Sequence, residues 1–210
     1  MQQQLQEAVD SNLAEFTEQN EEGIYTLQGA AVCIDNHTGY VKAIVGGRNQ
    51  NLSGYTLNRA YQSFRQPGSA IKPLIVYTPA LERQYTPDSI VSDEKIEDGP
   101  SNAGDYYEGD ITLRYAVEKS KNTVAWNLLA ELTPEVGLSY LEEMNFSKLE
   151  AEDERLTSAL GGFTTGVSPV EMTAAYAALE NEGKYREPTC IVKITDADLS
   201  LIHISEPTRP

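Results

Sequence analysis

Histidine is scarce in this chain, whose 210 residues include only His37 and His203. A Ser-His-Asp triad, in which a histidine takes the serine proton, is therefore disfavoured. Cysteine is equally rare, and Cys33 and Cys190 both lie in apolar runs. We interpret these two as small buried apolar residues rather than as a disulfide or a nucleophile, and no metal-ligand cluster is visible in the sequence.

Basic residues and long apolar runs are also few. Lys and Arg number 16 against 32 Asp and Glu, which gives a formal net charge of −16. An acidic surface repels nucleic-acid phosphate and anionic lipid, so we expect no nucleic-acid partner. The apolar runs are too short for a membrane span, and no signal peptide follows Met1. The apolar content of 40% is ordinary for a globular domain with a real core.

The hydrophobic pattern predicts an α+β chain, with a pair of strands ahead of a run of helices. The turn Asn36-His-Thr-Gly39 joins the first two strands as a hairpin. Residues 85–109 are rich in acidic residues and turn formers, so we expect an irregular excursion there, a long segment without regular secondary structure. The expected strands are 27–35, 41–45 and 189–195. The expected helices are 2–18, 69–83, 112–120, 123–132, one starting at Thr133-Pro134, and one from the capping box Ser168-Pro-Val-Glu171 to near Gly183.

The stretch Arg65-Gln-Pro-Gly-Ser-Ala-Ile-Lys-Pro73 carries the first candidate chemistry. Pro67-Gly68 predicts a turn, which places Ser69 at a helix N-terminus, where free N–H groups and the helix dipole favour developing negative charge. Lys72 follows three residues later, so its amine shares a helix face with the Ser69 hydroxyl. Burial lowers the pKa of a lysine, which lets its neutral amine act as a base. The alternative is a plain helix start with a solvent-facing lysine.

The spacing of Ser69 and Lys72 is weak evidence on its own, because Ser-x-x-Lys arises by chance about once in a chain of this length. A second match, Ser92-Asp-Glu-Lys95, lies in the acidic excursion without an apolar helix. We interpret this second match as chance, since a motif needs its structural context.

A second candidate motif, Ser120-Lys121-Asn122, lies at a junction between two expected helices. Ser120 and Asn122 are two residues apart and can point into one cleft. The Ser120 hydroxyl could relay a proton to a leaving group, and the Asn122 amide could hold a peptide carbonyl and contact Lys72. Ordinary helix capping is the alternative, because it favours Ser and Asn equally well.

Together the two motifs and their flanks resemble the penicillin-recognising serine enzymes, whose known motifs are S-x-x-K, S-D-N and K-T-G. The likeness is strongest to the transpeptidase domain of class A (bifunctional) penicillin-binding proteins and spans about residues 20–196. The matching stretches are 27–35, 38–39, 45–47, 57–60, 65–73, 120–122, 160–162 and 164–172.

The resemblance implies the β-lactamase-like α+β fold, a helical subdomain packed on an antiparallel sheet. It implies that Ser69 is the acylated nucleophile, Lys72 its base, Ser120 a proton relay and Asn122 a substrate-binding residue. The Ser69 N–H would be one oxyanion donor. The implied reaction is D,D-transpeptidation of peptidoglycan stem peptides at the extracytoplasmic face of the bacterial membrane, without cofactor or metal. β-Lactams would bind as substrate mimics, and other cell-wall synthesis proteins are further candidate partners.

The sequence departs from the family at its end, because no K-T-G motif follows Ser120-Lys121-Asn122. His37-Thr-Gly39 resembles a looser form of that motif, but it precedes Ser69 and belongs to the expected hairpin turn. The last twelve residues, 199–210, resemble the translation of a sequencing adapter, so we treat them as non-native. Residues 1–198 would then be a partial transpeptidase domain whose C-terminal strands are missing.

Two other functions share Ser69 and stay open at this point. One is a hydrolase of the D,D-carboxypeptidase or β-lactamase type. The other is a non-catalytic module that binds peptidoglycan or a β-lactam without turnover.

We predict that the 210-residue chain by itself is inactive, because the strand that should face Ser69 lies beyond residue 198. The check is incubation of the isolated chain with a fluorescent penicillin. No covalent label is expected, and a label that is lost in Ser69→Ala would show the prediction to be wrong.

Overall fold

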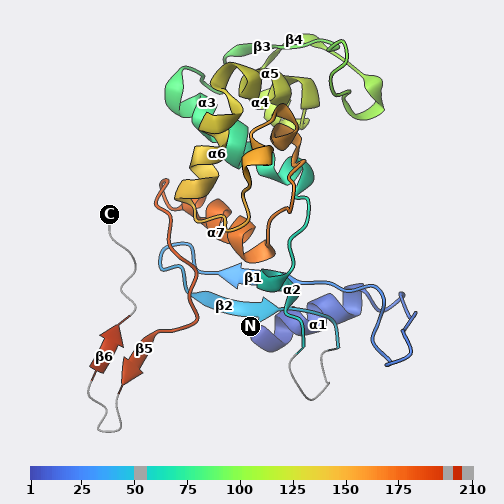
Figure 1. The fold of residues 1–210 in the computed structure, drawn as a ribbon, viewed down its shortest axis with the longest axis vertical. Helices are drawn as coiled ribbons and strands as arrows, with labels where there is room; N and C mark the ends of the chain where they lie inside the picture. Colours follow the sequence, from blue (N-terminus) through green and yellow to red (C-terminus); the bar gives the residue numbers. More distant parts are fainter. Residues whose placement is uncertain (50–55, 196–200, 205–210) are drawn as a thin grey trace. The chain divides into compact units, whose positions relative to one another are not determined.

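The computed structural model describes residues 1–49, 56–195 and 201–204. Its contacts divide the chain into two compact units: Met1–Phe64 with Ser168–Pro210, and Arg65–Val167. Both units combine helices with short antiparallel strand pairs, so the predicted α+β class is confirmed (Figure 1). No helix within the described ranges is long and apolar enough to cross a membrane.

The first unit is built on the antiparallel pair β1 (Ala31–Ile34) and β2 (Val41–Val45). The predicted hairpin turn is present, because the N–H of Gly39 donates to the carbonyl of Asp35 at 2.8 Å and Gly39 has φ of +74°. His37 lies in this turn, 3.0 Å from the side-chain oxygen of Asn181. The interpretation of His37-Thr-Gly39 as a turn is therefore confirmed.

Helices flank this strand pair within the first unit. Helix α1 (Gln2–Asn12) packs against β2, and α7 (Pro169–Glu180) packs against β1 and α2 (Arg59–Gln62) (Figure 1). Helix α7 begins with the predicted capping box, in which Ser168 and Glu171 satisfy each other's backbone N–H. The unit also contains β5 (Lys193–Thr195), which pairs with β6 (Leu201–Ile204).

The second unit holds most of the helices. They are α3 (Thr78–Arg83), α4 (Leu113–Glu118), α5 (Asn122–Leu132) and α6 (Pro134–Glu143), with the short turns η3 (Ala103–Asp105), η4 (Ala151–Asp153) and η5 (Leu156–Leu160). As predicted, α6 has Thr133 as its N-cap and Pro134 as its first residue. The core of the second unit forms where α5, α6 and η5 pack against the apolar segment η2 (Pro73–Tyr77).

The predicted continuous helix over 69–83 is wrong in detail. A 3₁₀ segment η1 (Gly68–Ile71) is followed by the π-helical segment η2 and then by α3. Pro73 and Pro79 lack the N–H groups that a regular helix would use, and the N–H of Thr78 instead reaches back five residues to the Pro73 carbonyl.

Other predicted boundaries also change. The excursion 85–109 contains the strand β3 (Ile90–Asp93), which pairs antiparallel with β4 (Gly109–Thr112) across an acidic loop. The pairing partner is distant in sequence, so the local pattern did not indicate it. Helix α1 ends at Asn12, short of the predicted residue 18, and Phe16 beyond its end is exposed. The first and last predicted strands shorten to β1 and β5.

Residues 199–210, which we excluded from the fold prediction as non-native, contain β6. One further expectation needs correction. Both cysteines are free, as expected, but Cys190 is exposed and Cys33 only partly buried.

Gly137 on α6 packs closely against Leu129 and Ile75, and we predict that Gly137→Ala destabilises the protein. An added Cβ would lie 2.6 Å from a Leu129 methyl and 2.7 Å from the Ile75 carbonyl oxygen. Overpacking of this kind costs about 1–3 kcal/mol, which exceeds the roughly 1 kcal/mol that alanine gains over glycine in a helix. Urea unfolding measures the change.

The matched control is Glu142→Ala at an exposed position of α6. It should leave the free energy of unfolding within about 0.5 kcal/mol of the parent value. A stabilised Gly137→Ala protein would contradict the close packing.

Candidate active site

The predicted nucleophile lies in an exposed turn of the second unit. Gly68 has φ of +57°, which confirms the turn expected from Pro67-Gly68. Ser69 follows in the first turn of η1 and is exposed. The backbone N–H of Lys72 donates to the Ser69 carbonyl, so one 3₁₀ turn separates the two residues.

A glycine-rich loop supports the backbone ahead of Ser69. An added Cβ on Gly161 would lie 2.4 Å from the Gly68 nitrogen, and one on Gly166 would lie 2.5 Å from the Arg65 carbonyl. Arg65 and Val167 also exchange two backbone hydrogen bonds of 3.0 and 2.9 Å. The loop therefore contacts the nucleophile turn so closely that only glycine fits.

Side chains fix this loop from both sides. The Gln66 amide bonds to the backbone N–H and carbonyl of Phe163, the former at 2.6 Å. Asp153 is fully buried and accepts from the N–H and the hydroxyl of Thr164 at 2.6 and 2.7 Å. The loop at 160–166 is thus an ordered support for residues 65–68.

Lys72 is the centre of the candidate site. It is only 1% exposed, so its amine is buried and needs hydrogen-bond partners within the protein. The amine donates to the Ser120 carbonyl at 2.7 Å, to the Ser120 hydroxyl at 3.1 Å and to Oδ1 of Asn122 at 2.7 Å. The predicted contact between Lys72 and Asn122 is therefore present. The solvent-facing alternative for Lys72 is wrong.

Burial makes the neutral form of this amine more accessible than in an exposed lysine. Burial lowers the pKa of Lys72 to about 8, and the three acceptors around it are uncharged. About a tenth of the lysine is then neutral at pH 7, against a negligible fraction for an exposed lysine. An amine in this state can take a proton from a hydroxyl.

Ser120 occupies an unusual backbone conformation between α4 and α5. Its φ is +52°, which is uncommon outside glycine and recurs at functional sites. The side chain is exposed, while its carbonyl and hydroxyl both face the Lys72 amine. Ser120 also lines a pocket of this unit, together with residues of the loop between β3 and β4 and of the α4–α5 segment. These are Asn102, Ala103, Tyr106, Glu108, Tyr115, Lys119 and Lys121.

Asn122 is the first residue of α5, and both ends of its amide are engaged. Oδ1 accepts from Lys72, and Nδ2 donates to the Ser101 carbonyl at 2.8 Å. This pairing assigns the orientation of the amide and leaves one N–H of Nδ2 for another acceptor.

Lys121, between these two residues, binds in a different place. Its amine contacts the carboxylates of Asp93 at 2.6 Å and Glu108 at 2.7 Å. Burial acts to lower the pKa of Lys121, but the hydrogen bonds to the two carboxylates outweigh burial and raise it. Lys121 is therefore held as a cation.

The sequence did not identify Asp93, Asn102 or Lys121 as part of the site. The alternation in Ile90-Val-Ser-Asp93 was an available signal, since it places Val91 and Asp93 on one strand face. A buried aspartate requires a partner, and Lys121 lies beside the second motif.

The second Ser-x-x-Lys match lacks these features. Ser92 lies on β3, and both Ser92 and Lys95 are exposed. Its interpretation as a chance match is supported by this lack of shelter.

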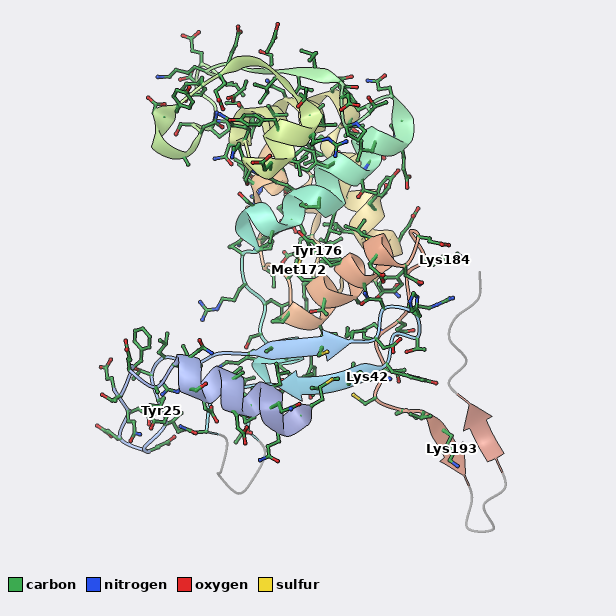
Figure 2. All side chains as sticks on the ribbon, turned by 180° about the vertical axis from the view of Figure 1, so that it is seen from behind. Tyr25, Lys42, Met172, Tyr176, Lys184 and Lys193 are labelled. Atoms are coloured by element: carbon green, nitrogen blue, oxygen red, sulfur yellow. The ribbon has the colours of Figure 1, made fainter. Side chains whose placement is uncertain are left out.

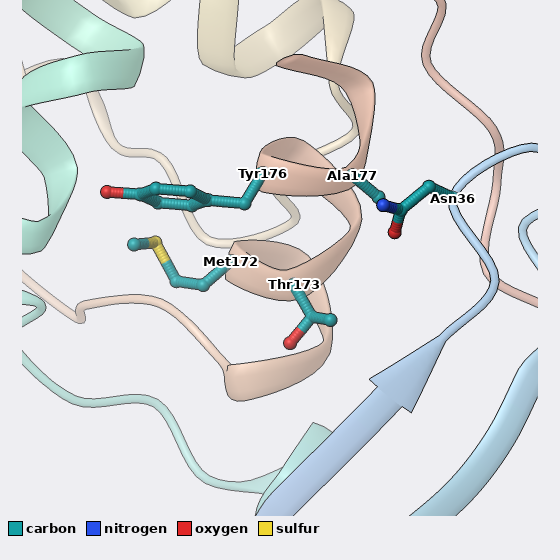
Figure 3. Close-up of a pocket in the computed structure, with 5 residues that line it drawn as sticks. All are labelled: Asn36, Met172, Thr173, Tyr176 and Ala177. Carbon is teal, nitrogen blue, oxygen red and sulfur yellow. The ribbon is translucent and has the colours of Figure 1, made fainter. Parts of the chain in front are cut away.

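A separate pocket lies in the first unit, along α7. Met172 and Tyr176 lie on this helix (Figure 2) and project from the same side of it, and Asn36, Thr173 and Ala177 complete the lining (Figure 3). None of the four predicted site residues lines this pocket.

Comparisons with known proteins agree with the two motifs. The family described as "Penicillin binding protein transpeptidase domain" matches residues 29–209. Penicillin-binding protein 4 of Bacillus subtilis is 40% identical over 174 residues, which cover 81% of this chain and 28% of that protein.

Two solved structures have a similar fold. The crystal structure of penicillin-binding protein 1A from Haemophilus influenzae has a TM-score of 0.72 and 30% identity, over 90% of this chain and 30% of that one. The PonA1 protein of Mycobacterium tuberculosis, solved in complex with penicillin V, has a TM-score of 0.73 and 23% identity, over 97% of this chain and 56% of that one.

The chain thus spans between a quarter and a third of the curated relative's length. The matched residues include both motifs and the loop that supports Ser69. The chain therefore belongs to the penicillin-binding protein transpeptidase domain family, as its resemblance to the class A members predicted.

Proposed function

We propose that the full-length protein carrying this chain is a serine D,D-transpeptidase that cross-links peptidoglycan stem peptides. The main support is the buried Lys72 amine, one 3₁₀ turn from Ser69 and bonded to Ser120 and Asn122. A desolvated amine with a lowered pKa, one helical turn from an exposed hydroxyl, has the properties expected of a general base for that nucleophile.

Acylation would begin with attack of the Ser69 Oγ on the carbonyl of the terminal D-Ala–D-Ala bond. The hydroxyl proton passes to the neutral Lys72 amine as the C–O bond forms. The tetrahedral intermediate places its negative charge near the Ser69 N–H, the proposed oxyanion donor. The C–N bond then breaks, and D-Ala leaves with a proton delivered through the Ser120 hydroxyl, which lies 3.1 Å from the Lys72 amine.

The second half-reaction uses the same groups in reverse. An amine of a neighbouring stem peptide attacks the Ser69 ester, loses a proton to Lys72 and forms the new amide bond. The Ser69 oxygen leaves and regains its proton. Asn122 would hold the donor peptide with the Nδ2 hydrogen that Ser101 does not use.

A β-lactam would bind in the same way, because its strained amide mimics the D-Ala–D-Ala bond and its acyl group stays on Ser69. The reaction would take place at the extracytoplasmic face of the bacterial membrane, where peptidoglycan is cross-linked. Product analysis with the full-length protein separates the transpeptidase from its alternatives. Transfer to an added amine supports it, whereas hydrolysis alone or a permanent adduct alone would favour a hydrolase or a binding module.

The first test of this function is the covalent label. We predict that the full-length protein is labelled by a fluorescent penicillin and that Ser69→Ala removes the label without loss of fold, because the label is an ester of the Ser69 oxygen. Ser92→Ala is the matched control and should keep full labelling, since Ser92 is exposed on β3. A label that persists in Ser69→Ala would rule out the assignment of the nucleophile.

The second test is the pH dependence of acylation. Only the neutral amine of Lys72 accepts a proton, so the second-order acylation rate constant should rise about tenfold per pH unit below 8 and level off above the pKa of about 8. Stopped-flow labelling from pH 6 to 9.5 measures the profile. Lys72→Gln should slow acylation by at least about a hundredfold and abolish this rise.

Lys95→Gln is the control for the loss of a lysine and should reproduce the parent profile, because Lys95 is exposed. An unchanged pH profile in Lys72→Gln would exclude Lys72 as the base.

A further inference from the structure

Helix α5, which carries Asn122, has no capping side chain of its own. Its N-cap residue is Lys121, whose side chain has no oxygen to accept the first N–H groups of the helix. Oδ1 of Asn102 takes this place, accepting from the N–H of Asn122 at 2.8 Å and from that of Thr123 at 3.3 Å. The cap therefore comes from a residue twenty positions earlier in the chain.

Asn102 is itself held in place. It is 5% exposed, and its Nδ2 donates to Oδ1 of Asp93 and to the Tyr106 carbonyl. With the oxygen committed to α5 and the nitrogen committed to these acceptors, its amide has a single hydrogen-bonded orientation.

Asp93 is the anchor of this arrangement, because it is fully buried at the end of β3. Besides Asn102, it accepts from the Thr123 hydroxyl at 2.6 Å, the Glu108 N–H at 3.1 Å and the Lys121 amine at 2.6 Å. Asp93 therefore connects β3, the acidic loop and the first turn of α5. Lys121 also pairs with Glu108, so a single cation lies between the two carboxylates.

The chain of contacts continues directly to the candidate base. Asn102 fixes the backbone of Asn122, and the Asn122 side chain accepts from the Lys72 amine at 2.7 Å. Asn102 makes none of its hydrogen bonds to Lys72, Ser69 or Ser120, so its influence on them passes through Asn122.

We propose that Asn102, oriented by Asp93 and Thr123, is a positioning residue that sets Asn122 and thereby the Lys72 amine for acylation of Ser69. This inference rests on the proposed function. Displacing a catalytic group by about 1 Å can cost up to about a hundredfold in rate. The loss of the Asn102 cap should therefore slow acylation more than it lowers the amount of folded protein.

The experiment compares variants of the full-length protein with a fluorescent penicillin as the probe. Two quantities are measured: the second-order acylation rate constant and the final amount of labelled protein, which reports the folded fraction. Asn102→Ala and Thr123→Val should each lower the rate constant by about tenfold or more, with the final label close to that of the parent.

Two further variants distinguish positioning from general stability. Thr123→Ser keeps the hydroxyl that donates to Asp93 and should acylate at nearly the parent rate. Thr133→Ala removes the cap of α6, away from this cluster, and should leave the rate constant unchanged. In Asn102→Ala, hydrogen exchange at the N–H groups of Asn122 and Thr123 should also accelerate.

Each outcome decides a different point. Parent-like rate constants in Asn102→Ala and Thr123→Val would overturn the positioning role and leave the proposed function intact. Absence of Ser69 labelling in the parent protein itself would overturn the proposed function and this inference with it. If Asn102→Ala does not fold, the pair Thr123→Val and Thr123→Ser decides, and equal rates in the two would overturn the inference.

Discussion

The candidate site depends on the hydrogen bonding of one buried amine. Lys72 is 1% exposed, and an amine without partners in such a place would cost several kcal/mol. Its partners come from Ser120 and Asn122, about fifty residues further along the chain. The residues that fix the junction of α4 and α5 therefore also fix Lys72, and the Lys72 side chain links the nucleophile turn to that junction.

Two lysines in this unit show how the surroundings of a side chain set its chemistry. Lys72 is buried among uncharged acceptors, which lowers its pKa to about 8. Lys121 is also buried, but its contacts with Asp93 and Glu108 outweigh the cost of burial and raise its pKa. One amine is thus available for proton transfer, whereas the other is a fixed structural cation. The two pKa values differ because carboxylates contact the Lys121 amine, whereas carbonyl, hydroxyl and amide oxygens contact the Lys72 amine.

The nucleophile turn receives its shape from backbone contacts rather than from large side chains. Gly161 and Gly166 lie against Gly68 and Arg65 at distances that exclude a Cβ, and Gln66 and Asp153 fix the loop that carries these glycines. Ser69 can remain exposed to a substrate because the rigidity comes from residues beneath and beside it. The family match, residues 29–209, includes the two motifs and the glycine-rich loop.

The sequence by itself determined the features that depend on neighbouring residues. The hairpin at 36–39, the Pro67-Gly68 turn, the Thr133 cap and the Ser168 capping box follow from local rules of backbone conformation and hydrogen bonding. The two motifs with their flanks were enough to indicate the family. Only the tertiary structure decided the pairing of β3 with β4, the 3₁₀ and π segments after Ser69, the burial of Lys72 and the cap that Asn102 provides for α5. These features join residues that are far apart in sequence or depend on how space is filled around a side chain, and a local pattern contains no information about either.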